Sequence, residues 1–165
     1  MSEQNPYDKY LDGRPLEEIL SSSPGAIGSL LEAIGSANAS VAPAPGKWSP
    51  AEIIAHLADC EIVFAFRLRQ TLAEDSPVIQ PFDQDKWAAQ YPGIGAEQAL
   101  EVFTALRNWN VKLISSALPA AASRPTTHPE RGAMTFLTIV ETMAGHDLNH
   151  LGQLARIASA PIPAA

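Results

Sequence analysis

Apolar residues recur along the chain at helical spacing, and proline residues separate the segments in which they do so. The fourteen prolines leave four long stretches free of proline, at 25–42, 51–76, 93–118 and 130–160. Because proline interrupts the interior of a helix, each of these stretches is a candidate helix. No run rich in Val, Ile and Thr alternates in the way expected of a strand. The pattern therefore predicts an all-α protein built as a four-helix bundle.

Signals for helix starts place the first two helices. Ser23 is a suitable N-cap and Pro24 occupies the favoured first position, which predicts a helix over 24–35, with a short leading helix over 15–20. The run Ser49-Pro50-Ala51-Glu52 has the form of a capping box with proline in the first turn, and predicts a second helix that continues to about residue 73.

The other two helices are expected over 96–118 and 135–159, after a long loop at 75–95 and a shorter one at 119–133. Loops as long as 75–95 inside a compact domain are often functional. The apolar positions expected to face inward on the third helix are Ala99, Val102, Phe103, Leu106, Trp109, Leu113 and Ala117.

Length and composition fit one soluble domain. The 165 residues divide into an N-terminal extension over 1–14, the bundle over 15–159 and a flexible tail over 160–165. A net charge of −7 with no cluster of Lys or Arg argues against nucleic acid as a partner. The chain has no apolar signal core and no run near the ~20 apolar residues of a membrane span, so we expect a cytoplasmic protein without a membrane partner. The single cysteine, Cys60, excludes an intrachain disulfide and a Cys-rich zinc site.

Three of the four histidines fall on inward-facing positions. His146 and His150 are four residues apart, so their side chains lie one above the other on the fourth helix. His56 lies in the apolar stripe of the second helix, and the three imidazoles would converge if the two helices are neighbours. Three protein ligands and an open position are typical of a catalytic metal site, where a divalent ion activates water. Imidazole suits several ions (Zn, Ni, Fe or Mn), of which we favour Zn or Ni.

Other residues near these histidines have two interpretations each. Asp59 and Asp147 are candidates to hydrogen-bond the outer nitrogens of the ligand histidines. His128 would act as a proton shuttle near a metal, or it is a structural loop residue. Cys60 would be a fourth ligand or nucleophile, or a buried core cysteine, and the last is the commoner role of such a residue. The histidines themselves would be core residues with satisfied hydrogen bonds if no metal binds.

Three motifs together resemble the DinB/YfiT-like superfamily, the damage-inducible four-helix-bundle family that is distinct from the translesion polymerase of the same name. The first is Trp48-Ser49-Pro50-x-Glu52-x-x-x-His56-Leu57. The second is His128-Pro129-x-x-Gly132-x-x-Thr135, and the third is His146-Asp147-x-x-His150-Leu151-x-Gln153. The likeness covers about residues 20–158 in order and spacing.

The resemblance implies a bundle of up-down-down-up type, a homodimer, and one divalent metal held by His56, His146 and His150. Family members include transferases and isomerases that use mycothiol or bacillithiol, domains that act with iron in ergothioneine biosynthesis, and many proteins described only as metal-dependent hydrolases. We therefore expect a metal-dependent enzyme that activates water or a small thiol against a small-molecule substrate, as a hydrolase or a thiol S-transferase. The alternatives are a non-catalytic metal-binding or stress-related protein, and a bundle used only for association.

Overall fold

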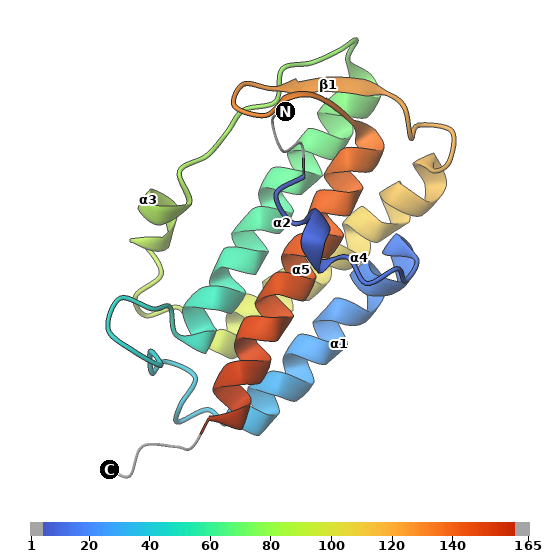
Figure 1. Cartoon of the computed structure of the whole chain (residues 1–165). Coiled ribbons are helices and arrows are strands. Elements are labelled where there is room, and N and C mark those ends of the chain that lie inside the picture. The colour runs from blue at the N-terminus through green and yellow to red at the C-terminus, as the bar shows by residue number, and fades with distance from the viewer. Residues whose placement is uncertain (1–4, 161–165) are drawn as a thin grey trace.

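The computed structural model describes residues 5–160 of the chain (Figure 1). The elements are a 3₁₀ turn at Asp8–Tyr10, α1 (Leu16–Ile34), α2 (Pro50–Ala73), α3 (Gln84–Ala88), α4 (Ala96–Ala117), β1 (Pro125–His128), β2 (Gly132–Thr135) and α5 (Phe136–Ser159). None of the described helices combines the length and the apolar character needed to cross a membrane.

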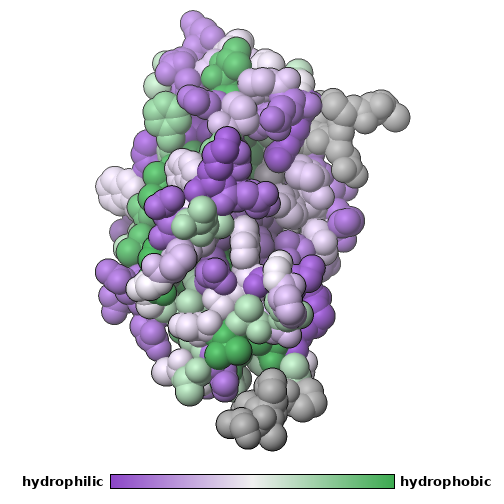
Figure 2. Space-filling view, turned by 90° about the vertical axis from the view of Figure 1, so that its left-hand side faces the viewer, coloured by the Kyte–Doolittle hydropathy of each residue, from purple (hydrophilic) through white to green (hydrophobic). Residues whose placement is uncertain are grey.

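The four long helices form a bundle in which α2 and α4 run in one direction and α1 and α5 in the other (Figure 1). The two parallel helices are joined by residues 74–95, which return along the outside of the bundle and contain the short α3. That segment lies on the face turned to the viewer in Figure 2, where hydrophilic residues occupy the centre. The predicted four-helix bundle, with its long loop between the second and third long helices, is confirmed.

The predicted break between residues 20 and 24 is wrong, because α1 is one continuous helix that contains Pro24. A proline inside a helix leaves the carbonyl four residues earlier without its N–H donor. Here that carbonyl belongs to Leu20, and Nη1 of Arg107 donates to it over 3.1 Å. Ser23 is not an N-cap; its hydroxyl donates to the Ile19 carbonyl at 2.8 Å. A tertiary contact therefore lets the helix pass through its proline.

The inward face of α4 also differs from the prediction. Trp109 and Val102, expected to be buried, are 63% and 44% exposed. Arg107 and Asn110 face the interior instead, at 1% and 0% exposure. The apolar periodicity was misleading because buried polar groups with partners are stable inside a bundle, and both residues have partners on neighbouring helices.

A two-stranded antiparallel hairpin precedes α5, within a segment that we expected to be a loop without strands. β1 pairs with β2 from Pro125 opposite Thr135 to His128 opposite Gly132. Each strand has only four residues. β1 alternates between exposed and buried positions, but its residues, Pro-Thr-Thr-His, do not alternate between apolar and polar types, so the sequence carried no strand signal. The hairpin is tied to the outer segment by the Thr126 hydroxyl, which donates to the Pro77 carbonyl at 3.0 Å. It places His128 at the end of the bundle where α5 begins.

Two apolar clusters fill the interior. One includes Leu57 and Phe103, and the other includes Cys60 and Met143. On α2, His56 lies among the residues of the first cluster, which continue to Ala58, and four residues before Cys60 of the second. The histidines are therefore set into the core itself, where the surroundings hold them rigid.

Candidate metal centre

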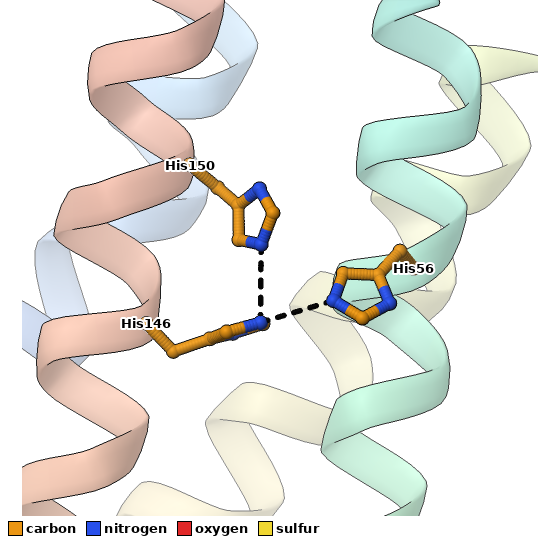
Figure 3. A group of neighbouring side chains, drawn as sticks. All are labelled: His56, His146 and His150. Carbon is orange, nitrogen blue, oxygen red and sulfur yellow. Dashed lines mark hydrogen bonds between the residues drawn. The ribbon is translucent and has the colours of Figure 1, made fainter. Parts of the chain in front are cut away.

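Three imidazole nitrogens meet between α2 and α5 (Figure 3). Nε2 of His146 lies 3.0 Å from Nε2 of His56 and 3.1 Å from Nε2 of His150. The ligand atoms of all three side chains lie within 4.8 Å of one another, and their exposures are only 1%, 3% and 5% for His56, His146 and His150. The structure thus brings together the three histidines selected from the sequence.

The helix starts fix where these side chains point. α2 begins with the predicted capping box, in which the Ser49 hydroxyl accepts from the Glu52 N–H and the Glu52 carboxylate accepts from the Ser49 N–H. α5 begins with a second box between Thr135 and Thr138. Because both helices start at defined residues, the later positions on each, including those of the histidines, have a fixed register.

The short nitrogen contacts do not form a satisfactory hydrogen-bond network by themselves. A neutral imidazole nitrogen carries either one proton or one lone pair, so it makes one good hydrogen bond in the ring plane. Nε2 of His146 faces two other Nε2 atoms at hydrogen-bond distance and cannot satisfy both. Three converging lone pairs suit a divalent ion instead, and this donor set therefore fits the metal that the three positions suggest.

Burial keeps the three rings neutral. It lowers the pKa of His56 to about 3, with a smaller contribution from His150. Burial likewise lowers the pKa of His146 well below its usual value, and that of His150 to a lesser extent, because the hydrogen bond to Gln153 partly opposes it. Near neutral pH every ring therefore has an unprotonated nitrogen available to a metal ion.

The outer nitrogen of His150 is held by Gln153, the last residue of the third sequence motif. Nδ1 of His150 donates to Oε1 of Gln153 at 3.0 Å. This bond puts the proton of the neutral ring on Nδ1 and leaves the lone pair on Nε2, the atom that faces the other histidines. The spacing of one helical turn between His150 and Gln153 was the signal in the sequence.

The carboxylates expected to hold the histidines have other partners. Asp59 accepts from the Tyr91 hydroxyl at 2.9 Å, beside a separate cavity of about 560 Å³ between α2 and α4. Asp147 pairs with Arg107. Neither has a hydrogen bond to a ligand histidine among the described residues, because Asp59 is held by Tyr91 in the segment before α4 and Asp147 by Arg107 on α4.

Arg107 joins the helices behind the metal centre. Its guanidinium bonds both oxygens of Asp147 on α5 and, at 2.7 Å, Oε1 of Glu61 on α2. Asn110 donates to the second oxygen of Glu61 at 3.0 Å. Burial alone would lower the pKa of Arg107, but the charges of Asp147 and Glu61 raise it. The buried network therefore fixes the helix that carries His146 relative to the helix that carries His56.

Two aromatic rings enclose the histidines. Trp48 lies 4.9 Å from the His56 ring, centroid to centroid, and Tyr7 packs edge-on against His146 at 5.0 Å. Sequence reasoning assigned Tyr7 to the N-terminal extension and missed its role. The available signal was Gly145, because a Cβ there would come within 2.5 Å of the Tyr7 carbonyl oxygen. A glycine beside His146 lets the N-terminal segment lie directly on α5.

Cys60 is buried beside the centre. Its sulfur lies 3.5 Å from Nε2 of His56 and 4.0 Å from Nε2 of His146. Burial raises the pKa of this thiol, and the nearby charges of Glu61 and Asp59 raise it further. Such a thiol stays protonated, which fits the interpretation of Cys60 as a buried core residue.

A cavity of about 160 Å³ opens on the side of the histidines that faces the hairpin, and both His56 and His146 line it. His128 lines it as well, so the structure brings this loop histidine to the site. Nδ1 of His128 accepts from the Glu130 N–H at 3.2 Å. Since burial and then Arg131 lower its pKa, the ring is neutral near pH 7 and its proton lies on Nε2.

The lowered pKa values of the histidines predict how metal-free protein responds to acid. In the unfolded chain His56 takes up a proton near pH 6.5, whereas in the folded protein it does so only near pH 3. Unfolding therefore binds protons between these values, and the free energy of unfolding falls as the pH falls through this range. Each such group contributes up to about 1.4 kcal/mol per pH unit. We expect urea unfolding of His56→Gln to show a slope smaller by about 1 kcal/mol per pH unit in this window. Equal slopes for the variant and the wild type would contradict the lowered pKa of His56.

Gly145→Ala is expected to detach the N-terminal segment from α5. The added methyl group would overlap the Tyr7 backbone, which cannot yield as a flexible side chain can. We expect the amides of Tyr10 and Leu11, which bond within this segment, to exchange with solvent at least about tenfold faster while the bundle keeps its protection. Gly152→Ala is the matched control on the same helix. Its nearest contact is the end of the Arg156 side chain at 3.5 Å, and the change should stabilise α5 by up to about 1 kcal/mol. Unchanged exchange in Gly145→Ala would show that the segment does not rest on this glycine.

Comparison with known proteins agrees with this architecture. A relative from Oceanobacillus iheyensis named "Putative metal-dependent hydrolase" is 29% identical over 113 residues, which cover 68% of this chain and 66% of the relative. A relative of the same description from Geobacillus kaustophilus is 28% identical over 68% of this chain and 65% of its own length. The chain thus spans slightly less than two thirds of the length of these curated relatives.

Among solved structures, YfiT from Bacillus subtilis, described as "a probable metal-dependent hydrolase with an unusual four-helix bundle topology", matches with a TM-score of 0.75. It is 19% identical to this chain, and the match covers 94% of this chain and 89% of YfiT. The match shows that the two share a fold. The family model of the DinB superfamily matches residues 20–154, which include all three histidines. The chain belongs to the DinB superfamily.

Proposed function

We propose that this protein is a metal-dependent hydrolase whose single divalent ion is held by His56, His146 and His150. The observation that carries the proposal is the convergence of three buried, neutral imidazoles, in which the Nε2 atoms of His56 and His150 both lie within hydrogen-bond distance of Nε2 of His146. The names of the curated relatives support hydrolysis as the reaction.

A divalent ion bound by three histidines lowers the pKa of a water molecule and polarises the bond to be hydrolysed. The chain's own residues prepare the place for this chemistry. Gln153 fixes the tautomer of His150, and Arg107 holds α5 in register with α2. Tyr7 and Trp48 shield the imidazoles from bulk water. The neutral His128 offers an Nε2–H donor to a substrate oxygen in the cavity that it lines.

Three imidazoles with no thiolate or carboxylate in the donor set favour zinc or nickel over harder ions. The geometry supports this donor set, because the group of ligand atoms that all lie within 4.8 Å of one another among the described residues consists of the three histidines and leaves out Cys60. Nickel and zinc therefore come first in reconstitution.

The test is metal content together with turnover. Untagged protein is expected to hold about one divalent ion per chain by mass spectrometry and to melt at a lower temperature after treatment with a chelator. The loaded protein is then screened against esters, amides and phosphoesters, and against conjugates of small thiols. Metal-dependent hydrolysis would support the proposal. Metal-dependent turnover of thiol conjugates alone would replace it with thiol transfer, and a bound metal without turnover would favour a non-catalytic binder. Failure to take up zinc, nickel, manganese or iron would overturn the metal centre.

The homodimer, the cytoplasmic location and a low-molecular-weight thiol as partner stay predictions. The three-part division of the chain does too, and residues 161–165 of the expected tail lie outside the described residues.

A further inference from the structure

We propose that the cavity beside the histidines binds an oxyanionic group of the substrate, a carboxylate or a phosphate, through the guanidinium of Arg67. The inference rests on the proposed function and specifies its substrate class. The cavity has a volume of about 160 Å³ and is bounded by α2, α5, the hairpin and the segment before α3. Arg67 and the proposed ligands His56 and His146 all line this one cavity.

Arg67 is a buried cation without an anionic partner in the described part of the chain. It projects from α2 three turns after His56 and is only 7% exposed. Its Nη2 donates to the Gln80 carbonyl at 2.7 Å, and this bond anchors one nitrogen of the guanidinium. Its Nε is buried and has no hydrogen-bond partner among the described residues. A buried donor left without a partner costs free energy, and an arriving oxyanion would remove that cost.

The other polar side chains around the cavity are predominantly donors and cations. Arg131 and His128 line it together with Arg67, and Glu130 is the one acidic side chain among the described residues that line it. Burial lowers the pKa of Arg67 to about 10, and the charge of Arg131 is the next cause. The charges of Arg131 and Arg67 also lower the pKa of His128. The charges of Arg67 and Arg131 repel each other and create a positive electrostatic potential in the cavity. A bound oxyanion would reduce this repulsion.

The size of the cavity limits the ligand. A water molecule occupies about 30 Å³ in the liquid, so the space holds about five waters, or one carboxylate or phosphate with a few neighbouring atoms. Guanidinium matches both oxyanions through parallel N–H donors. A substrate anchored here would have its anionic group at the Arg67 end of the cavity and the rest of the molecule directed toward His56 and His146. The expected substrates are therefore small acids or small phosphate esters rather than neutral apolar molecules.

Arginine side-chain NMR on the full chain tests the contact at the atom concerned. The Nε–H resonance of Arg67 is identified by its loss in Arg67→Lys. In wild-type protein freed of metal, in chloride-free buffer, we expect acetate or inorganic phosphate to shift this resonance saturably. The Nε–H resonance of Arg124, which donates to the Thr71 carbonyl, should not move. The anion that binds tighter identifies the substrate group as carboxylate or phosphate.

The affinity of the anion is then compared between the wild type and two variants, one at Arg67 and one at a control position. Arg67→Lys keeps the positive charge but loses the paired N–H donors of the planar guanidinium, and should weaken anion binding by about tenfold. Lys112→Met removes a positive charge from an exposed position on α4 and should leave the affinity within about twofold. An Arg67 resonance unmoved by both anions, or equal affinities in wild type and Arg67→Lys, would overturn the inference.

The acetate titration is repeated on zinc-loaded protein to separate this inference from the metal proposal. Zinc uptake without an acetate or phosphate effect at Arg67 would defeat the anion site and leave the metal centre standing. An anion effect at Arg67 in protein that takes up no divalent metal would support the anion site and defeat the metal centre.

Discussion

His150→Ala is expected to weaken zinc binding by more than about a hundredfold, to below one ion per ten chains after dialysis. The substitution removes one of three imidazoles and, with it, the hydrogen bond that the ring donates to Gln153. Helix content should be unchanged, because alanine favours a helix and α5 has its own capping box. Competition against a zinc-binding dye measures the affinity, and circular dichroism measures the helix content.

Two further variants test which other side chains contribute to zinc affinity. Gln153→Leu keeps all three ligands and loses only the orienting bond, so zinc affinity should fall by about tenfold to a hundredfold. Cys60→Ser should bind zinc as the wild type does, because the group of converging ligand atoms among the described residues consists of the three histidines. Stoichiometric zinc in His150→Ala would remove His150 from the ligand set, and loss of zinc in Cys60→Ser would place the sulfur in it.

Arg107→Met should lower the free energy of unfolding by about 3–5 kcal/mol at neutral pH. Methionine keeps an unbranched apolar stem, but it leaves Asp147 and Glu61 buried without their cation, at 1% exposure each. It also removes the donor to the Leu20 carbonyl that Pro24 leaves open. Urea unfolding measures the change, and Arg156→Met, at an exposed position, should stay within about 0.5 kcal/mol of the wild type.

A combined variant separates the loss of charge balance from the loss of packing. Glu61→Gln and Asp147→Asn added to Arg107→Met remove the buried negative charges, and should recover about half or more of the lost stability. No recovery in the combined variant would mean that the guanidinium acts by filling space rather than by balancing charge.

The strength of local signals separates what could be predicted from what could not. The capping box at Ser49 placed α2, and the four-residue spacing of His146 and His150 placed two nitrogens on one face of α5. These are short-range rules that depend only on neighbouring residues. The contact of these two histidines with His56 requires α2 to lie beside α5. The prediction of this contact depended on the fold class, because no local signal shows which helices are neighbours.

The errors came from contacts between distant residues. Pro24 continues a helix only because Arg107 reaches the open carbonyl of Leu20, and Arg107 is buried only because Glu61 and Asp147 bind it. No periodicity on one helix reveals a cation whose partners lie on two others. The contact of Tyr7 with His146 is of the same kind, since only the close approach at Gly145 permits it.

The parallel arrangement of α2 and α4 has a consequence for the newly made chain. His56 and His146 are separated by 90 positions, so at about 5–20 residues per second a ribosome takes roughly 5–18 s to make the second after the first. Throughout that interval the apolar face of α2 lacks its partner α5. Residues 74–95 return along the outside of the bundle and do not cover this face. Bundle closure, and any uptake of a metal ion by the three histidines, are therefore both expected only after α5 has left the ribosome.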